Sequence, residues 1–218
     1  LEQVSDRTTF FNFLASHDGI GVMPAKGILS EEEINNMVEK AIEHGGYVSY
    51  KDNGDGTKSP YELNINYFDA LSHPEDEEEI KIKRFIGSQG ILLSLMGVPA
   101  IYIHSLLGSR NYNEGVKESG IYRRINREKL LLEKLEKELN DKNTLRNKIF
   151  SKYVELIRIR KAEKAFHPNA KQKVIFANEF VFSFVRTSLD NEEAIIVLNN
   201  VSNEEQKVKI ELKEYGLE

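Results

Sequence analysis

The stretch FFNFLASHDGIG, from Phe10 to Gly21, decides the fold. Its apolar, aromatic beginning predicts a β-strand that is buried on both faces. Gly19 and Gly21 permit a positive φ and a sharp exit, so His17 and Asp18 are expected where the strand ends. In α/β barrels this carboxyl-terminal rim carries the chemistry, although a lone His-Asp pair more often serves in capping or in a salt bridge.

Length and composition describe a globular chain of one large domain, or of one domain with a small second one. Hydrophobic residues make up 40% of the 218 residues and charged residues 30%, which excludes a disordered or membrane-spanning class. The net charge of −5 argues against nucleic acid, and the lack of cysteine excludes disulfides and thiolate sites. No signal peptide is recognisable, so a cytoplasmic location is expected. The first residue is Leu1, which favours a piece of a longer protein.

The residues after this stretch predict alternating helices and strands. Ser30 and Glu33 have the spacing of a capping box, which predicts a helix that ends near Gly45. A long helix followed by a continuous apolar run is typical of half of a βαβ unit. The further expected elements are hairpin strands at 47–50 and 60–63, a helix from about Ser72 to Met96 and a buried strand at 98–103.

The second half of the chain predicts two more helices and then strands. Helical spacing of apolar residues runs from Glu128 to Asn140 and, with Thr144 as N-cap, to about Glu163. Helices followed by strands suggest a separate C-terminal β domain, which is cut short because so few strands rarely close a sandwich. The leucines expected to face inward are Leu131, Leu132, Leu135 and Leu139, and the expected strands are 173–177, 180–187, 194–198 and 206–213.

A polar segment after the predicted strand at 98–103 carries several arginines. Loops after interior strands carry function more often than other loops do. The spacing of the arginines alone nevertheless favours a solvated or phosphate-attracting surface over a functional site. These residues are Arg110, Arg123, Arg124 and Arg127.

Five segments carry a family resemblance: FLASHDGIG (13–21), SPYELNINY (59–67), GVPAIY (97–102), SLLGSRN (105–111) and RINREK (124–129). Together they resemble the α-amylase superfamily, and in particular its sucrose phosphorylase branch, which acts on sucrose, sucrose 6-phosphate or glucosylglycerate. Each motif is weak alone, but the set spans nearly the whole chain in the expected order. Ala15 and Ser16 stand where broader amylases often have Asp and Asn, which favours the phosphorylase branch over starch hydrolases.

The resemblance implies an α/β fold. Residues 1–165 would be the C-terminal portion of a (β/α)8 TIM barrel, and residues 166–218 a truncated all-β C-terminal domain. It also implies a retaining mechanism in which a carboxylate nucleophile and an acid/base flank the scissile bond. Both groups would lie on earlier strands, outside this chain. Asp18 would be the catalytic carboxylate that stabilises the transition state, and His17 and Arg123 would bind the glucosyl unit of the substrate.

The function implied is that of a fragment of a cofactor-free, retaining glycoside phosphorylase. Its parent would transfer a glucosyl unit from sucrose or a related small α-glucoside to inorganic phosphate, giving glucose 1-phosphate, and the fragment alone would be inactive. The alternatives are an α-glucosidase or transglycosylase of the same superfamily, and a non-catalytic amylase-like interaction module. The acceptor stays open among fructose, fructose phosphate, glycerate and water.

The partners expected from this function are small-molecule substrates, with no nucleic acid, membrane or metal. A phosphorylase needs a positively charged, water-poor pocket for phosphate, and the four arginines are candidates for its lining. Opening a barrel leaves strands unpaired. Self-association of the fragment is therefore expected at Phe10–Leu14 and at Val98–Ile103.

Overall fold

The computed structural model describes residues 4–215, which divide into two compact units. The middle unit comprises residues 14–85 and 101–151, and the terminal unit comprises residues 4–13, 86–100 and 152–215. Helices α3 (Glu78–Ser94) and α7 (Leu145–Ala162) contribute residues to both units. No helix among the described residues has the length and apolar character needed to cross a bilayer.

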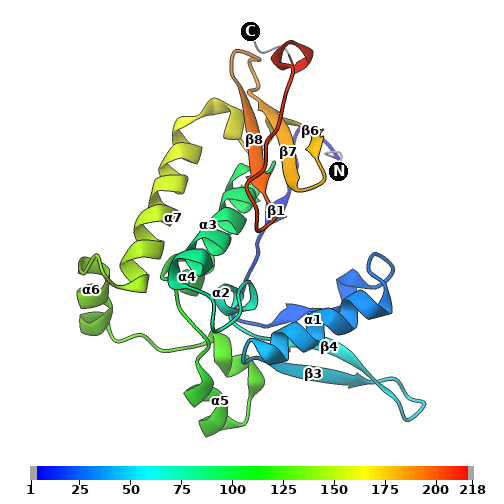
Figure 1. Ribbon diagram of the computed structural model, residues 1–218, viewed down its shortest axis with the longest axis vertical. Coiled ribbons are helices and arrows are strands. Elements are labelled where there is room, and N and C mark those ends of the chain that lie inside the picture. The colour runs from blue at the N-terminus through cyan, green and yellow to red at the C-terminus, as the bar shows by residue number, and fades with distance from the viewer. Residues whose placement is uncertain (1–3, 216–218) are drawn as a thin grey trace. The chain divides into compact units, whose positions relative to one another are not determined.

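Short strands and helices make up the rest of both units (Figure 1). The middle unit holds β2 (Ile20–Gly21), α1 (Glu31–Glu43), β3 (Tyr47–Asp52), β4 (Lys58–Asn64), α2 (Tyr67–Ala70), α4 (Ile103–Leu106), α5 (Asn113–Ser119) and α6 (Leu132–Asn140), with 3-10 turns η1 (Met23–Ala25) and η2 (Tyr122–Asn126). The terminal unit holds β1 (Phe11–Asn12), β5 (Val98–Pro99), β6 (Lys171–Asn178), β7 (Val181–Thr187) and β8 (Ala194–Asn200), with turns η3 (Lys164–Phe166) and η4 (Leu212–Tyr215).

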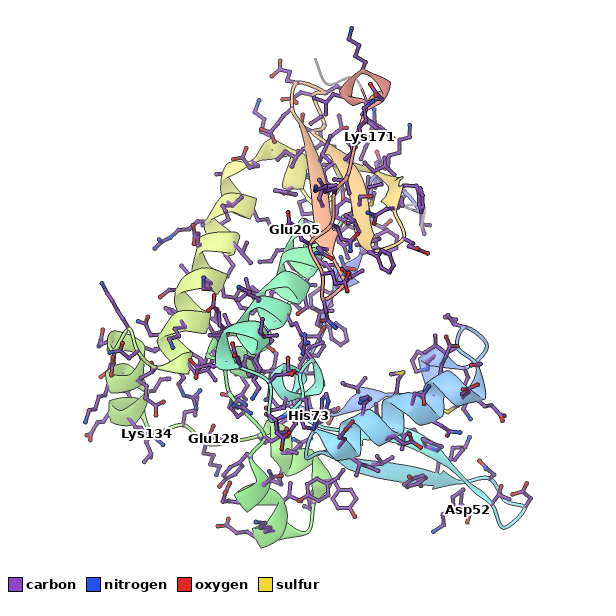
Figure 2. The ribbon with its side chains drawn as sticks, in the orientation of Figure 1. Asp52, His73, Glu128, Lys134, Lys171 and Glu205 are labelled. Carbon is purple, nitrogen blue, oxygen red and sulfur yellow. The ribbon has the colours of Figure 1, made fainter. Side chains whose placement is uncertain are left out.

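Helix α1 and the β3–β4 hairpin, both predicted from the sequence, pack together in a hydrophobic core of the middle unit. The Ser30 hydroxyl accepts a hydrogen bond from the Glu33 N–H, and the Glu33 carboxylate accepts one from the Ser30 N–H, so the capping box is present. Helix α1 lies along the hairpin (Figure 1), whose tip carries Asp52 (Figure 2). Strand β2 joins them in an antiparallel sheet of order β2-β4-β3. The buried side chains of this core are Val22, Ile34, Val38, Ala41, Val48, Leu63 and Ile65.

The strand predicted at residues 10–14 is much shorter than expected and is not buried on both faces. Strand β1 pairs in parallel with β5 and, among the described residues, with no other strand. Phe11 is 68% exposed and Phe13 is 57% exposed. The apolar run predicts that the side chains of Phe11 and Phe13 are buried by a neighbouring element, but no described element covers them. The strand predicted at 98–103 is also shortened, because it ends at Pro99 and α4 begins at Ile103.

The larger sheet of the terminal unit confirms three of the four strands expected after residue 165. Strands β6, β7 and β8 pair antiparallel in that order. The fourth strand, expected at 206–213, is wrong, because residues 206–211 have no strand structure and η4 begins at Leu212. Val208 and Ile210 are still less exposed than Lys207 and Lys209. Alternating apolar and charged residues show that one face of an extended segment is covered. They do not show that the segment is hydrogen-bonded to a neighbouring strand.

Two arginines satisfy carbonyl groups at and after the C-terminal end of α3. Arg186 is fully buried on β7 and donates to the carbonyl oxygens of Ser94 and His167 at 2.6 and 2.8 Å. Arg160 donates to the carbonyl oxygen of Gly97 at 2.6 Å. Burial lowers the pKa of both guanidinium groups. Cations at this end of a helix also compensate its dipole, so the arginines tie β7 and α7 to α3.

Helix α6 begins later than predicted and does not bury its leucines. The helix expected to start at Glu128 begins at Leu132. Leu131 is 73% exposed and Leu132 is 67% exposed, so the expected inward orientation is wrong for both. Amphipathic spacing shows which face of a helix needs cover, but it does not show that cover is present. Helix α3 likewise begins at Glu78, later than the expected Ser72.

A glycine is needed at position 19, just before β2, because neighbouring atoms leave no room for a Cβ. Its backbone conformation does not require glycine. The sequence allowed a positive φ at Gly19 and Gly21, but neither residue has one. A Cβ on Gly19 would lie 2.5 Å from the carbonyl oxygen of Leu63 and 2.7 Å from Cγ of Glu62. Because β2 pairs with β4 beside this contact, the backbone cannot withdraw without loosening the sheet.

Gly19→Ala should therefore destabilise the chain by about 1–3 kcal/mol, the usual cost of forcing extra atoms into a packed site. Gly87→Ala in α3 is the matched control, because a Cβ there meets nothing within 4 Å. Alanine favours a helix interior by roughly 0.5–1 kcal/mol over glycine, so this control should be stabilised. Urea-induced unfolding measures both variants, and equal stabilities would contradict the close-approach explanation.

His104 in α4 provides a pH-dependent element of stability in the middle unit. His104 is 7% exposed, and its Nδ1 lies 2.8 Å from the hydroxyl of Ser109. Burial lowers the pKa of His104 below its usual 6.5, and the positive charge of Arg146 acts in the same direction, while Glu128 opposes them. The unfolded chain therefore binds more protons than the folded chain just below that pH.

Stability should consequently rise with pH through the window between the lowered pKa of His104 and about 6.5. Acidification from about pH 8 to about pH 5.5 should lower the Tm of the wild type more than that of His104→Gln. The Tm of each protein at about pH 8, where the imidazole is neutral in either state, serves as its own reference. Parallel Tm curves for the two proteins would rule out His104 as the source.

Candidate active site

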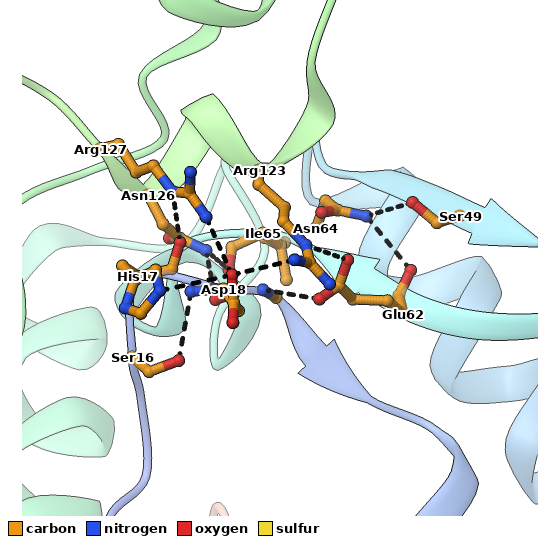
Figure 3. A network of polar contacts seen from close by, with 11 residues as sticks. Ser16, His17, Asp18, Ser49, Glu62, Asn64, Ile65, Arg123, Asn126 and Arg127 are labelled. Atoms are coloured by element: carbon orange, nitrogen blue, oxygen red, sulfur yellow. Dashed lines mark hydrogen bonds and ion pairs between the residues drawn. The ribbon is translucent and has the colours of Figure 1, made fainter.

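The carboxylate of Asp18 lies among three cationic or polar side chains of the middle unit (Figure 3). Its Oδ1 atom is 2.9 Å from Nη2 of Arg127 and 3.3 Å from Nη1 of Arg123. His17 Nε2 lies 3.7 Å from the same oxygen. The Asp18 side chain is 37% exposed, so the carboxylate is held in place and still open to a ligand.

The backbone of the His17–Asp18 loop is fixed by η2 and the residue after it. The side-chain amide of Asn126 donates to the carbonyl oxygens of Asp18 and Ile65, at 3.1 and 3.2 Å. Arg127 donates from Nε to the carbonyl oxygen of His17 at 2.9 Å. The Ser16 hydroxyl accepts a hydrogen bond from the Asp18 N–H at 3.1 Å. The loop therefore has little freedom to move the carboxylate.

Glu62 on β4 is a buried acid beside this loop. It is 5% exposed, and its Oε1 accepts a hydrogen bond from the Gly19 N–H at 3.2 Å. Its Oε2 accepts one from Nε of Arg123 at 2.9 Å. This hydrogen bond and the negative charges of Glu62 and Asp18 raise the pKa of Arg123. Glu62 thus links β4 to both the loop and Arg123 (Figure 3).

The charges of the site alternate and balance. Two carboxylates, Glu62 and Asp18, face two guanidinium groups, and Arg123 contacts both acids. Both arginine contacts to Asp18 fall on Oδ1, and no described residue donates to Oδ2. Such a carboxylate can accept hydrogen bonds from hydroxyl groups and can stabilise positive charge that develops nearby. Both oxygens of Glu62 accept hydrogen bonds, one from the loop backbone and one from Arg123.

The structure brings together the three site residues that the sequence singled out: His17, Asp18 and Arg123. The four arginines considered for a phosphate pocket divide. Arg123 and Arg127 contact Asp18, whereas Arg110 donates from Nε to Asp69 at 2.5 Å and lies over the ring of Phe68. The Nε of Arg124 is buried without a partner among the described residues.

Sequence reasoning missed Glu62, Asn126 and Ser16. The signal for Glu62 was a charged residue in the middle of a strand, between Tyr61 and Leu63, where a buried acid needs partners. Asn126 and Ser16 hold the loop through backbone groups, and side chains of this kind leave no recognisable spacing in a sequence.

Comparisons with known proteins identify relatives of one kind. No family model matches the chain. The glucosylglycerate phosphorylase of Allomeiothermus silvanus is 49% identical to it, in an alignment that covers 94% of this chain and 36% of the relative. The glucosylglycerate phosphorylase of Spirochaeta thermophila is 44% identical, and that alignment covers 95% of this chain and 35% of the relative. The sucrose phosphorylase of Streptococcus mutans is more distant, at 26% identity over 83% of this chain.

A solved structure shares the fold of the chain. The crystal structure of sucrose 6F-phosphate phosphorylase from Thermoanaerobacter thermosaccharolyticum matches 88% of this chain with a TM-score of 0.73 at 22% identity, and 35% of that protein is covered. The chain thus spans about a third of the length of the proteins it matches. The resemblance predicted from the motifs is confirmed: the chain is homologous to part of the glycoside phosphorylases of the sucrose phosphorylase branch.

Proposed function

We propose that this chain is the C-terminal third of a retaining glycoside phosphorylase, called here the parent protein. The observation that carries the proposal is the Asp18 carboxylate, fixed by Arg127 and Arg123 with one oxygen left open, in a chain whose relatives are phosphorylases. The reaction would move a glucosyl unit from a small α-glucoside to inorganic phosphate and release glucose 1-phosphate.

The proposed architecture follows the family resemblance. Residues 1–165 would close the (β/α)8 barrel of the parent protein, and residues 166–218 would belong to its C-terminal β domain. The nucleophile and the acid/base would come from barrel strands upstream of this chain. The exposed rings of Phe11 and Phe13 support this arrangement, because a closed barrel would cover them. In the isolated chain the same rings favour self-association. A cytoplasmic location remains part of the proposal.

Asp18 would act on the sugar through hydrogen bonds and charge. Its open oxygen would accept hydrogen bonds from sugar hydroxyls, which strengthen as the ring flattens toward an oxocarbenium-like transition state. His17, whose side chain is 67% exposed beside this carboxylate, would donate to the same glucosyl unit. Arg123 is the substrate-binding arginine expected from the sequence, and the shorter contact of Arg127 with Asp18 adds Arg127 to the proposed site.

Glucosylglycerate is the α-glucoside that we propose as substrate. The three relatives with identities of 44–49% carry the name glucosylglycerate phosphorylase, whereas proteins named for sucrose or sucrose 6(F)-phosphate are 26–30% identical. Glycerate is an anion, and the guanidinium group of Arg127 suits a negatively charged leaving group or phosphate.

A phosphorolysis screen of the parent protein tests this proposal. Glucosylglycerate, sucrose and sucrose 6-phosphate are each supplied with inorganic phosphate, and glucose 1-phosphate is followed. We expect turnover of glucosylglycerate by the parent protein and none by the isolated chain, which would lack the nucleophile and the acid/base. Release of free glucose would instead indicate a glucosidase, and inactivity on every donor would indicate an interaction module.

Asp18→Asn in the parent protein should lower kcat roughly a hundred- to a thousandfold, the usual effect of losing one preorganised electrostatic contact. The amide keeps the shape and loses the charge, so KM should change little. Asp76→Asn is the control, since Asp76 also pairs with an arginine, Arg84, away from the loop. Steady-state phosphorolysis with circular dichroism as the folding check measures both, and an Asp18→Asn enzyme with near wild-type kcat would remove Asp18 from the site.

A further inference from the structure

Glu62 uses both of its oxygens on residues that build the candidate site. Oε1 accepts the Gly19 N–H at 3.2 Å, and Oε2 accepts Nε–H of Arg123 at 2.9 Å. The side chain of Glu62 is 7% exposed, against 40% for Arg123 and 37% for Asp18. Glu62 therefore lies behind Arg123 and holds it from the protein side.

We propose that Glu62 is a positioning residue, which holds Arg123 in place and offsets its charge so that the Asp18 carboxylate keeps its geometry and its negative field. This proposal rests on the proposed function of Asp18. Glu62 acts through Arg123, which one of its oxygens holds, while the other oxygen holds the Gly19 N–H.

The geometric part of the argument concerns the direction of the guanidinium group. Arginine has a long side chain with many rotamers, and ordering it costs rotamer entropy. The bond from Glu62 to Nε fixes the plane of the fork and directs Nη1 toward Asp18. Without that bond Arg123, which is partly exposed, is free to turn into solvent.

The electrostatic part concerns the balance of charge. Asp18 contacts two guanidinium groups, and two uncompensated cations would largely cancel the field of one carboxylate. Glu62 is the more deeply buried acid, and its bond to Arg123 is the shorter one, at 2.9 Å against 3.3 Å. Glu62 therefore takes up most of the charge of Arg123, and Asp18 keeps its own for the substrate.

A second buried acid of the middle unit, Asp69, also accepts hydrogen bonds from an arginine and from a backbone N–H, but it makes no contact with the His17–Asp18 loop. Asp69 accepts hydrogen bonds from Nε of Arg110 at 2.5 Å and from the Asn111 N–H at 2.6 Å, and its side chain is 8% exposed. It matches Glu62 in burial, in its arginine partner and in its backbone partner. Asp69→Asn therefore controls for the structural cost of neutralising such an acid.

The kinetic test uses Glu62→Gln and Asp69→Asn in the parent protein. Glutamine keeps the shape but has one acceptor oxygen in place of two. When that oxygen accepts the Gly19 N–H, the NH2 group faces Arg123 and cannot accept a hydrogen bond from it. We expect kcat for phosphorolysis to fall roughly 10- to 100-fold in Glu62→Gln, the range expected of a misplaced group, with less than twofold change in Asp69→Asn. In an Arg123→Met background the Glu62→Gln change should add less than twofold, because its target is already gone.

A spectroscopic test on the 218-residue chain does not depend on the proposed function. In NMR spectra of the wild type, the Nε–H of Arg123 should exchange with water more slowly than that of Arg158, an exposed arginine on α7. In Glu62→Gln that protection should disappear, while the Gly19 amide stays protected. The wild-type measurement needs no variant and so survives any failure of Glu62→Gln to fold.

The outcomes separate the two proposals. Loss of Arg123 protection together with loss of kcat supports the positioning role. Unprotected Arg123 in the wild type, or a kcat in Glu62→Gln equal to that of Asp69→Asn, overturns it. A parent protein without phosphorolysis on any donor defeats the proposed function and with it the positioning role, although protected Arg123 would leave the Glu62–Arg123 bond standing.

Discussion

The double contact of Arg127 with the His17–Asp18 loop is the interaction on which the site depends. One nitrogen of the guanidinium group holds the carbonyl oxygen of His17, and another holds the carboxylate of Asp18. Backbone and functional group are thereby fixed by one planar fork, whose geometry is rigid. Asn126, the preceding residue, holds the loop on its other carbonyl. The position of the carboxylate therefore follows the position of η2, and η2 in turn is held by the bond between Asn126 and Ile65 just after β4.

Burial explains why the charges of this site form a chain and not a single pair. A buried carboxylate such as Glu62 loses its hydration and needs hydrogen bonds to replace it. A backbone N–H supplies one of these bonds and Arg123 supplies the other. Because Arg123 also contacts Asp18, the hydrogen bond that the buried Glu62 needs places Arg123 where it pairs with the more exposed Asp18. The acid that contributes to structure and the acid proposed for chemistry are thus two ends of one network.

Local signals in the sequence predicted the parts of the fold that depend on local physics. The Ser30–Glu33 capping box and the N-cap at Thr144 are both present, because their hydrogen bonds lie within one turn of chain. Elements that need a distant neighbour were predicted less well. The strand at 206–213 is missing and Leu131 is exposed. An amphipathic pattern shows which face of a segment is apolar, but it does not show which other element, if any, covers that face.

The candidate site shows the same division. His17 and Asp18 were found because they stand in a motif at the end of an apolar run. The sequence could not rank Arg123 and Arg127, which lie at one end of η2 and just after it, because only tertiary structure decides which nitrogen reaches Oδ1 of Asp18. Glu62 was invisible as a partner, since its two bonds join residues that lie far apart in the chain.

The contact at Gly19 also has an evolutionary consequence. The motif holds two glycines of equal appearance, but a Cβ at Gly21 would meet only Cδ of Pro24, at an ordinary 3.8 Å. Gly21 can therefore drift to other small residues while the fold persists. Gly19 cannot drift as long as β2 pairs with β4, because every other amino acid brings a Cβ against the Leu63 carbonyl. The two glycines of the motif are therefore under different structural constraints: the neighbouring strand β4 restricts Gly19, whereas Gly21 has room for a Cβ.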